Sequence, residues 1–144
     1  AKKAGEAEDL PTAALAAGEL VGACADCHAT TGKGPTFGEP GKVPQGEDTT
    51  ARMLRHQWAA DRMWEGIVSN SETHWKLGTH AISEKPPEPC PIPSDDILPK
   101  DVLDLREKIY ELGPKAAEAK DRASRTKIYG EYLQTCAGCH VGGC

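Results

Sequence analysis

The sequence has few aromatic residues and no long hydrophobic run. It contains a single Phe, and Phe, Trp and Tyr together make up 5% of its 144 residues. Aromatic side chains contribute much of the buried area of most cores, so the polypeptide alone predicts a thin core. The most apolar window, residues 10–25, is dominated by alanine and interrupted by Glu19. No stretch reaches the ~20 apolar residues of a membrane-spanning helix, and we expect no membrane span.

Basic residues are also in the minority. Lys and Arg number 17 and Asp and Glu number 22, which gives a net charge of -5. This balance argues against nucleic acid or an anionic membrane as a partner, and it favours a partner protein with a basic docking face. The length predicts one compact domain. The oligomeric state does not follow from the sequence.

Four of the six cysteines belong to two copies of the pattern Cys-x-x-Cys-His, at residues 24–28 and 136–140. This pattern is the attachment site of a c-type haem. The two thiols bond the porphyrin vinyl groups, and the following histidine is the proximal iron ligand. The sequence therefore predicts two covalently bound haem c groups. The expected cofactor-binding residues are Cys24, Cys27, His28, Cys136, Cys139 and His140.

Two other kinds of site use paired cysteines. A zinc site would not require a histidine directly after both pairs. A thioredoxin-like redox pair is expected at a helix N-terminus within a βαβ pattern, which the sequence lacks. Both alternatives explain the repeated motif less well than haem attachment.

Cys90 and Cys144 remain after the motif cysteines are assigned. Covalent haem attachment normally takes place outside the cytoplasm, so we expect a periplasmic protein whose signal peptide has been removed. In an oxidising compartment, an even remainder of cysteines predicts a disulfide between Cys90 and Cys144. The alternative is two unrelated free thiols.

A short internal repeat surrounds the two motifs. Residues 18–28 align with residues 130–140, with Gly, Glu, both Cys, the first Ala and the His identical. Apolar character is also kept at the two positions after the Glu. The repeat is too short to indicate two equal domains, and it predicts two equivalent helix ends that carry haem.

The remaining patterns are all helical. Apolar residues at spacings of three and four predict helices from Thr49 or Thr50 to about Ser69, and from a cap at Ser71 to Ile82. A third helix is expected after Pro99, with Gly113 and Pro114 closing it, and a fourth from about Pro114 into the second motif. Two Gly- and Pro-rich loops, residues 30–48 and 84–99, are expected to lie over haem edges. We divide the chain into an N-terminal haem-attachment segment, 1–48, and a four-helix bundle, 49–144.

From about Thr49 to Cys144 the chain resembles the class II cytochromes c, the cytochrome c-prime and cytochrome c-556 family. The resemblance rests on residues 129–140, at the end of the last predicted helix, and on residues 52–56. It implies an antiparallel four-helix bundle whose first helix faces the distal side of the C-terminal haem. The family lacks the first fifty residues and their second motif. The whole chain also looks like dihaem members of this wider group.

The motifs themselves identify His28 and His140 as the proximal ligands. The sixth iron ligands have to be inferred from the positions of other residues. His56 lies on the apolar face of the helix that begins near Thr49, and Met53 precedes it by one turn on that face. We predict that His56 ligates one iron. The other iron is either ligated by Met53 or left open. Met63 is expected to be core filler. His74 and His80 lie among polar residues and are weaker candidates.

Tryptophans and arginines complete the set of expected haem contacts. Trp58, Trp64 and Trp75 are expected to pack on the porphyrins, and ordinary core packing is the alternative. Arginine suits carboxylates, so haem propionates are possible partners for three arginines of the same helix. These are Arg52, Arg55 and Arg62, and solvated helix charges are the alternative.

Three functions are compatible with these motifs. The leading prediction is a non-enzymatic dihaem cytochrome c that transfers single electrons between periplasmic partners. The alternative is a haem protein that binds or senses nitric oxide or carbon monoxide at an open iron. A peroxidase would need an acid–base group above an open iron, for which only His56 is a candidate. The pattern identifies no named partner and no redox potential.

Overall fold

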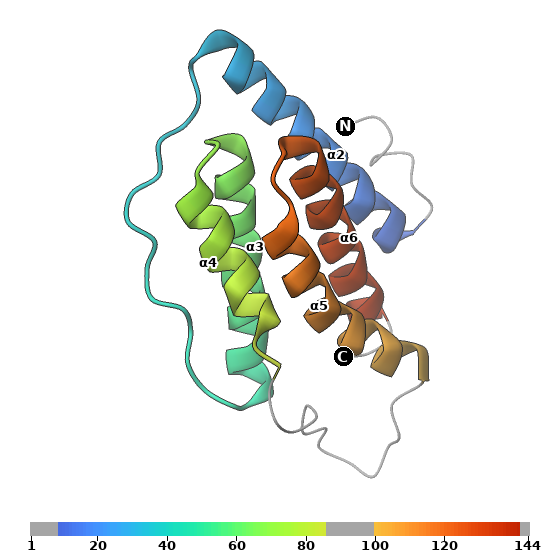
Figure 1. The fold of residues 1–144 in the computed structure, drawn as a ribbon. Coiled ribbons are helices and arrows are strands. Elements are labelled where there is room, and N and C mark those ends of the chain that lie inside the picture. The colour runs from blue at the N-terminus through green and yellow to red at the C-terminus, as the bar shows by residue number, and fades with distance from the viewer. Residues whose placement is uncertain (1–8, 86–99, 142–144) are drawn as a thin grey trace.

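A computed structural model describes residues 9–85 and 100–141. This part of the chain forms five α-helices and no β-strand, so the expected all-α fold is confirmed. Figure 1 shows α3 to α6 packed as a bundle, with α2 lying along one side. The helices are α2 (Leu10–Thr31), α3 (Thr49–Val68), α4 (Glu72–Ser83), α5 (Lys100–Glu118) and α6 (Arg122–Val141).

Side-chain caps fix where four of the helices begin. Asp9 accepts a hydrogen bond from an amide in the first turn of α2, and Asp121 accepts from the Ser124 amide at 2.9 Å in α6. Ser71 caps α4, as the sequence predicts. In α3 the cap is Asp48, whose carboxylate accepts from the Ala51 amide at 2.8 Å. A carboxylate there satisfies an amide that has no partner within the helix, so the expected cap at Thr49 or Thr50 is wrong by one or two residues.

The predicted helix end at Gly113 and Pro114 is also wrong. The α5 helix continues through both residues to Glu118. Gly113 serves close packing, because a Cβ at this position would collide with Ser83 of α4. A glycine followed by a proline resembles a helix stop in sequence, yet here the glycine is required by a neighbouring helix.

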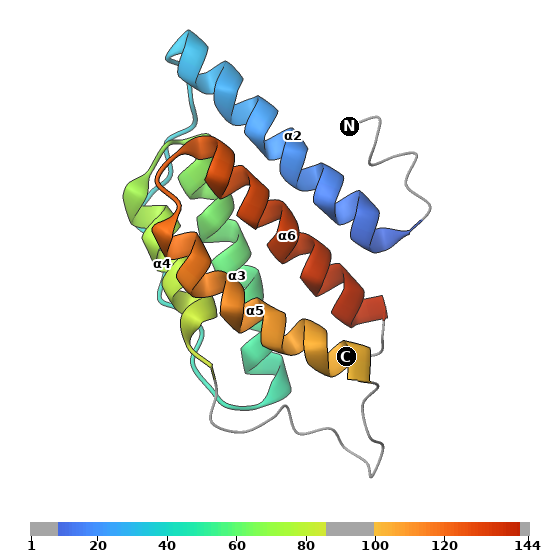
Figure 2. The same cartoon turned by 45° about the vertical axis from the view of Figure 1, so that its right-hand side comes forward.

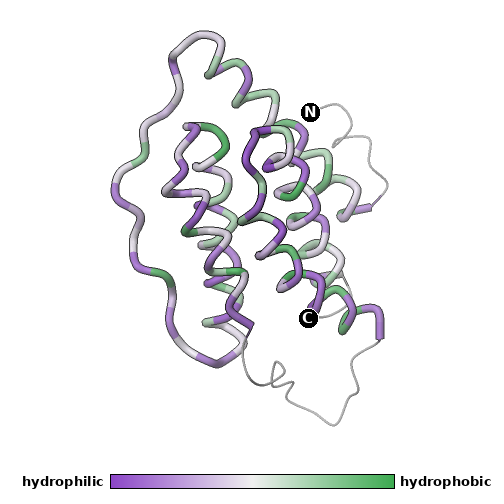
Figure 3. Tube along the Cα trace, in the orientation of Figure 1, coloured by the Kyte–Doolittle hydropathy of each residue, from purple (hydrophilic) through white to green (hydrophobic). Residues whose placement is uncertain are grey.

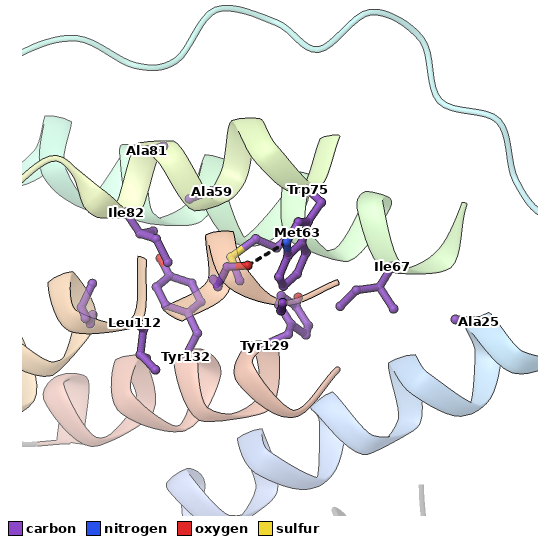
Figure 4. Packing of buried hydrophobic residues seen from close by; sticks show 13 residues of the cluster. Ala25, Ala59, Met63, Ile67, Trp75, Ala81, Ile82, Leu112, Tyr129 and Tyr132 are labelled. Atoms are coloured by element: carbon purple, nitrogen blue, oxygen red, sulfur yellow. Dashed lines mark hydrogen bonds between the residues drawn. The ribbon is translucent and has the colours of Figure 1, made fainter. Parts of the chain in front are cut away.

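Tertiary hydrogen bonds hold the part of α5 that follows Pro114. The indole Nε1 of Trp75 donates to the Ala116 carbonyl at 3.0 Å (Figure 4), and Arg125 Nε donates to the Ala119 carbonyl at 3.1 Å. The Ala116 carbonyl also accepts from the Ala119 amide at 3.2 Å, so the indole adds a tertiary partner at the helix end. The two tertiary bonds also tie α4 and α6 to the end of α5.

The hydrophobic core lies between α3, α4, α5 and α6. Figure 4 shows Tyr132, Met63, Trp75, Tyr129 and Ile67 following one another along the core. Met63 is fully buried, in agreement with the expectation that it fills the core. Along each helix in Figure 3, hydrophobic positions recur among hydrophilic ones, which is typical of helices with one packed face.

The α2 and α6 helices pack side by side in antiparallel directions (Figure 2). Gly18 faces Gly130 so closely that a Cβ on Gly18 would collide with the Gly130 backbone. Toward the other end, Arg122 pairs with Asp26 at 2.9 Å. Because residue 18 aligns with residue 130 in the internal repeat, the two copies of the repeat cross at this glycine pair.

Residues 32–48 form an irregular segment that connects α2 to α3 along the outside of α3 and α4 (Figure 1). Arg55 holds its end, because the guanidinium donates to the carbonyls of Pro44 at 3.2 Å and Gly46 at 3.1 Å. None of the helices described is both long enough and apolar enough to cross a membrane. The predicted Cys90–Cys144 disulfide and most of the second predicted loop lie outside the described residues.

Candidate functional site

A cavity of about 380 Å³ lies at the C-terminal motif, between α3, α5 and α6. Cys136, Cys139 and His140 line one side of it from the last turns of α6. Cofactor sites typically measure ~300–1,000 Å³ and are lined mainly by apolar groups. The size and position of this cavity therefore match a cofactor joined to those cysteines.

His56 and Met53 of α3 line the same cavity, with Ala60 one turn further along. The structure thus brings both predicted sixth ligands to one motif, the C-terminal one. It does not place them between two motifs, because the N-terminal motif lies at the other end of the molecule. Whether either residue ligates iron remains a prediction.

Two tyrosines fix the position of His56. The Tyr132 hydroxyl donates to the backbone carbonyl of His56 at 2.9 Å, and the His56 ring meets the Tyr110 ring edge-on with centroids 6.1 Å apart. Burial, with smaller contributions from Arg55 and His140, lowers the pKa of His56 to about 4. The imidazole is therefore neutral at pH 7, which is the form that binds metals.

Arg52 and Arg106 line this cavity from α3 and α5. Guanidinium groups bind carboxylates through paired hydrogen bonds, so these two arginines are suitable partners for propionates. Arg106 was missed in the sequence, although it lies on the apolar face of α5, one turn from Val102 and Tyr110. Arg55 and Arg62 have other partners, the segment before α3 and Glu65 respectively.

A second cavity, of about 500 Å³, lies at the N-terminal motif. Its walls include Cys24 and His28 of α2, and Trp64 and Val68 at the end of α3. Cys24 and Cys27 are exposed, whereas Cys136 and Cys139 are half-buried. The N-terminal cavity is consequently the more open of the two.

The ring of His28 is held by a hydrogen bond characteristic of metal-ligating histidines. Its Nδ1 lies 3.2 Å from the Val68 carbonyl oxygen. A carbonyl can only accept, so Nδ1 carries a proton, and in the neutral ring Nε2 is then the nitrogen with the lone pair. Histidines that ligate metals usually donate their second ring N–H in this way. Gly34 packs against the same ring, and a Cβ on it would lie 3.5 Å from that of His28.

Several residues proposed as haem contacts lie elsewhere. Trp75 is buried in the core, and Trp58 lines a separate cavity beside residues 40–45. Only Trp64 borders a motif. His74 is buried, with Nδ1 2.7 Å from the Ser71 hydroxyl. His80 is exposed on α4 and pairs with Glu84.

The two motifs lie at opposite ends of the α2–α6 pair. Each motif histidine follows the central glycine of its helix by ten residues, and the two helices are antiparallel at those glycines. At 1.5 Å per residue, His28 and His140 are separated by about 30 Å along the helix axes. A bundle of this size favours haems that lie close together, whereas these two motifs lie far apart.

Burial raises the pKa of the Cys136 thiol to about 11, although the neighbouring Tyr132 hydroxyl opposes the shift. The thiol is therefore protonated at pH 7, and only the minor thiolate form would act as a nucleophile. Across residues 9–85 and 100–141, no group of three or more His, Cys, Asp or Glu side chains is arranged to hold a metal ion.

Comparison with protein-family models, with curated proteins and with solved structures found no match to this chain. The motifs and the geometry around them are therefore what indicates a function. At the C-terminal motif, the cavity, the facing His56 and Met53, and the two arginines fit a haem c group. At the N-terminal motif, the cavity and the orientation of His28 fit one as well.

Proposed function

We propose that the protein is a dihaem cytochrome c that transfers single electrons. The observation that carries this proposal is the arrangement at the C-terminal motif. His140 and the two cysteines border a cavity, and the neutral His56 borders it from the facing helix. When bound, haem c supplies an iron that gains or loses one electron at a time.

The side chains around the C-terminal cavity suit electron transfer better than catalysis on a substrate. His140 would provide the proximal ligand, and His56 or Met53 the sixth ligand. With His140 and either His56 or Met53 as ligands, the protein would leave no place for a substrate on that iron. Arg52 and Arg106 would hold the propionates, and the walls of Ile109, Tyr110 and Leu133 would exclude water. A peroxidase, which needs an open iron below an acid–base group, is disfavoured there.

Partner and compartment follow from the same proposal. We infer redox proteins as partners, and the net charge of -5 favours those with a basic docking face. Because covalent haem attachment normally occurs outside the cytoplasm, we infer a periplasmic location. This inference rests on the net charge alone.

Intact mass, spectra and potentials of the holoprotein test the proposal. The mass should equal the polypeptide plus two haems, and both haems should accept one electron reversibly. A mass that corresponds to no haem or to a single haem would refute the dihaem assignment. Two haems that cannot be reoxidised by a second cytochrome would refute electron transfer.

The sixth ligand of the C-terminal haem is tested by His56→Ala, with His80→Ala as the matched control. Loss of His56 should convert one haem from low-spin to high-spin, or give it a sulfur-ligand band if Met53 replaces the imidazole. The exposed His80 should be replaceable without spectral change. If His56→Ala leaves both haems unchanged, His56 is a packing residue only.

A further inference from the structure

All candidate imidazole and thioether ligands of this sequence can be located. The five histidines and two methionines fall within the described residues. Two of the histidines belong to the motifs themselves. The places of the remaining five residues therefore decide which imidazole or thioether side chain could reach the N-terminal haem.

None of those five residues borders the N-terminal cavity. Met53 and His56 line the C-terminal cavity, and Met63 is enclosed in the core beneath Gly78. His74 is held between Ser71 and Glu65, and the ring of Phe37 lies over it, 6.1 Å away between centroids. His80 lies on the outer face of α4 beside Glu84.

Other nitrogen or sulfur groups along this cavity are few. Besides Cys24 and His28, two of the described residues that line this cavity have a side-chain nitrogen. They are Trp64, with its indole, and Lys33. An ammonium group has no lone pair to give to iron. In addition, residues 32–34 begin four residues after His28, and a Cβ on Gly34 would lie 3.5 Å from the His28 Cβ, so this segment lies beside the proximal histidine.

The remaining walls of the cavity are apolar. They include Leu20, Val21, Pro35, Trp64 and Val68. Leu20 is 43% exposed and Trp64 38% exposed, which is high for large apolar side chains at a cavity. Such walls suit a small neutral ligand, because an anion would lose hydration against them, with Lys33 as the cationic side chain to offset that loss.

We propose that the N-terminal haem iron has no sixth ligand from the protein and binds small neutral diatomic molecules, whereas the C-terminal iron is closed. This inference rests on the proposed dihaem function and assigns different roles to the two sites. The C-terminal haem exchanges electrons, and the N-terminal haem is the ligand-binding site.

Carbon monoxide titration of the reduced holoprotein tests this proposal. The expected stoichiometry is one CO per protein, that is, one for every two haems. Loss of the N-terminal haem in Cys24→Ala/Cys27→Ala should reduce binding to zero. The matched variant Cys136→Ala/Cys139→Ala should still bind one CO. Binding of CO at the C-terminal haem alone, or at neither haem, would overturn the inference.

Two further variants keep the test decisive if a motif variant fails to fold. Double replacement Met53→Ala/His56→Ala should open the second iron and raise the stoichiometry from one CO to two. Lys33→Ala should leave CO binding unchanged. If Lys33→Ala instead creates CO binding that the unmodified protein lacks, Lys33 is the ligand and the inference is wrong. A protein with no haem by mass spectrometry would refute the proposed function itself, whereas two low-spin haems that ignore CO refute only this inference.

Discussion

The two ends of the α2–α6 pair carry the same motif in different surroundings. Around Cys136 and Cys139 three helices enclose a cavity, and His56 and Met53 face it. Around Cys24 and Cys27 the motif lies at an exposed helix end against α3 and residues 33–35. The comparison teaches that two identical motifs can lie in different surroundings, because the neighbouring helices decide which other side chains reach each of them.

Loss of attachment should distinguish the two ends most strongly. We expect Cys136→Ala/Cys139→Ala to lower the free energy of unfolding of the holoprotein by about 2–5 kcal/mol, because an empty cavity remains inside the bundle. The same change at Cys24 and Cys27 should cost less than half as much. Thermal and urea unfolding measure both. Equal losses would show that the N-terminal haem is as much a part of the core as the C-terminal one.

Packing of α2 on α6 should matter next. Gly18→Ala places a Cβ against the Gly130 backbone. Overpacking costs ~1–3 kcal/mol, and it is partly offset by the ~1 kcal/mol that alanine gains over glycine in a helix. We expect the free energy of unfolding to fall by roughly 1 kcal/mol. Protection of backbone amides from hydrogen exchange should be lost in the N-terminal part of the chain before the C-terminal part. Gly41→Ala is the control, because a Cβ at that position would meet open space. An equal loss of stability in Gly41→Ala would show that the loss in Gly18→Ala does not come from contact with Gly130.

A smaller effect is expected at the C-terminal cavity from Tyr132→Phe. This change removes the hydrogen bond to the His56 carbonyl and should cost about 0.5–1.5 kcal/mol. Since the bond positions the turn that carries His56, the spectrum of the C-terminal haem should also change, while CO binding at the N-terminal haem should not. A change in stability without any spectral change would limit Tyr132 to packing.

Acid should weaken the contact that Glu72 of α4 makes with Arg125 of α6. The hydrogen bond from Arg125 is the main cause that lowers the pKa of Glu72 below its usual value. A carboxylate with a lowered pKa in the folded state stabilises the fold above its unfolded pKa, and the contribution is lost as the pH falls through the folded value. We expect Glu72→Gln to flatten the acid side of the stability profile below about pH 4.5. An unchanged profile would contradict a role for this pair.

Much of the fold could be predicted from local patterns. The ranges of α3 and α4 follow from apolar spacing and, in α4, from the Ser71 cap, because such signals depend on neighbouring residues. The boundary at Gly113 and Pro114 could not be predicted. Its glycine makes room for Ser83, thirty residues earlier in the chain, and this requirement leaves no local sign.

The candidate site shows the same division. His56 and Met53 could be selected because they share a helical face. Arg106 could have been found by the same argument on α5. The hydrogen bond from His28 to the Val68 carbonyl could not, since any residue at position 68 would offer that carbonyl.

The sequence by itself determined the proposal of covalent haem attachment, because two thiols and a histidine at fixed spacing need only one turn of helix to meet a porphyrin. It also determined the helical class, through the period of its apolar residues. Only the tertiary structure decided that the motifs lie at opposite ends and that His56 and Met53 reach the same one. The physical reason is that α2 and α6 pack in antiparallel directions at Gly18 and Gly130, and contact between distant helices depends on the shape of both surfaces together.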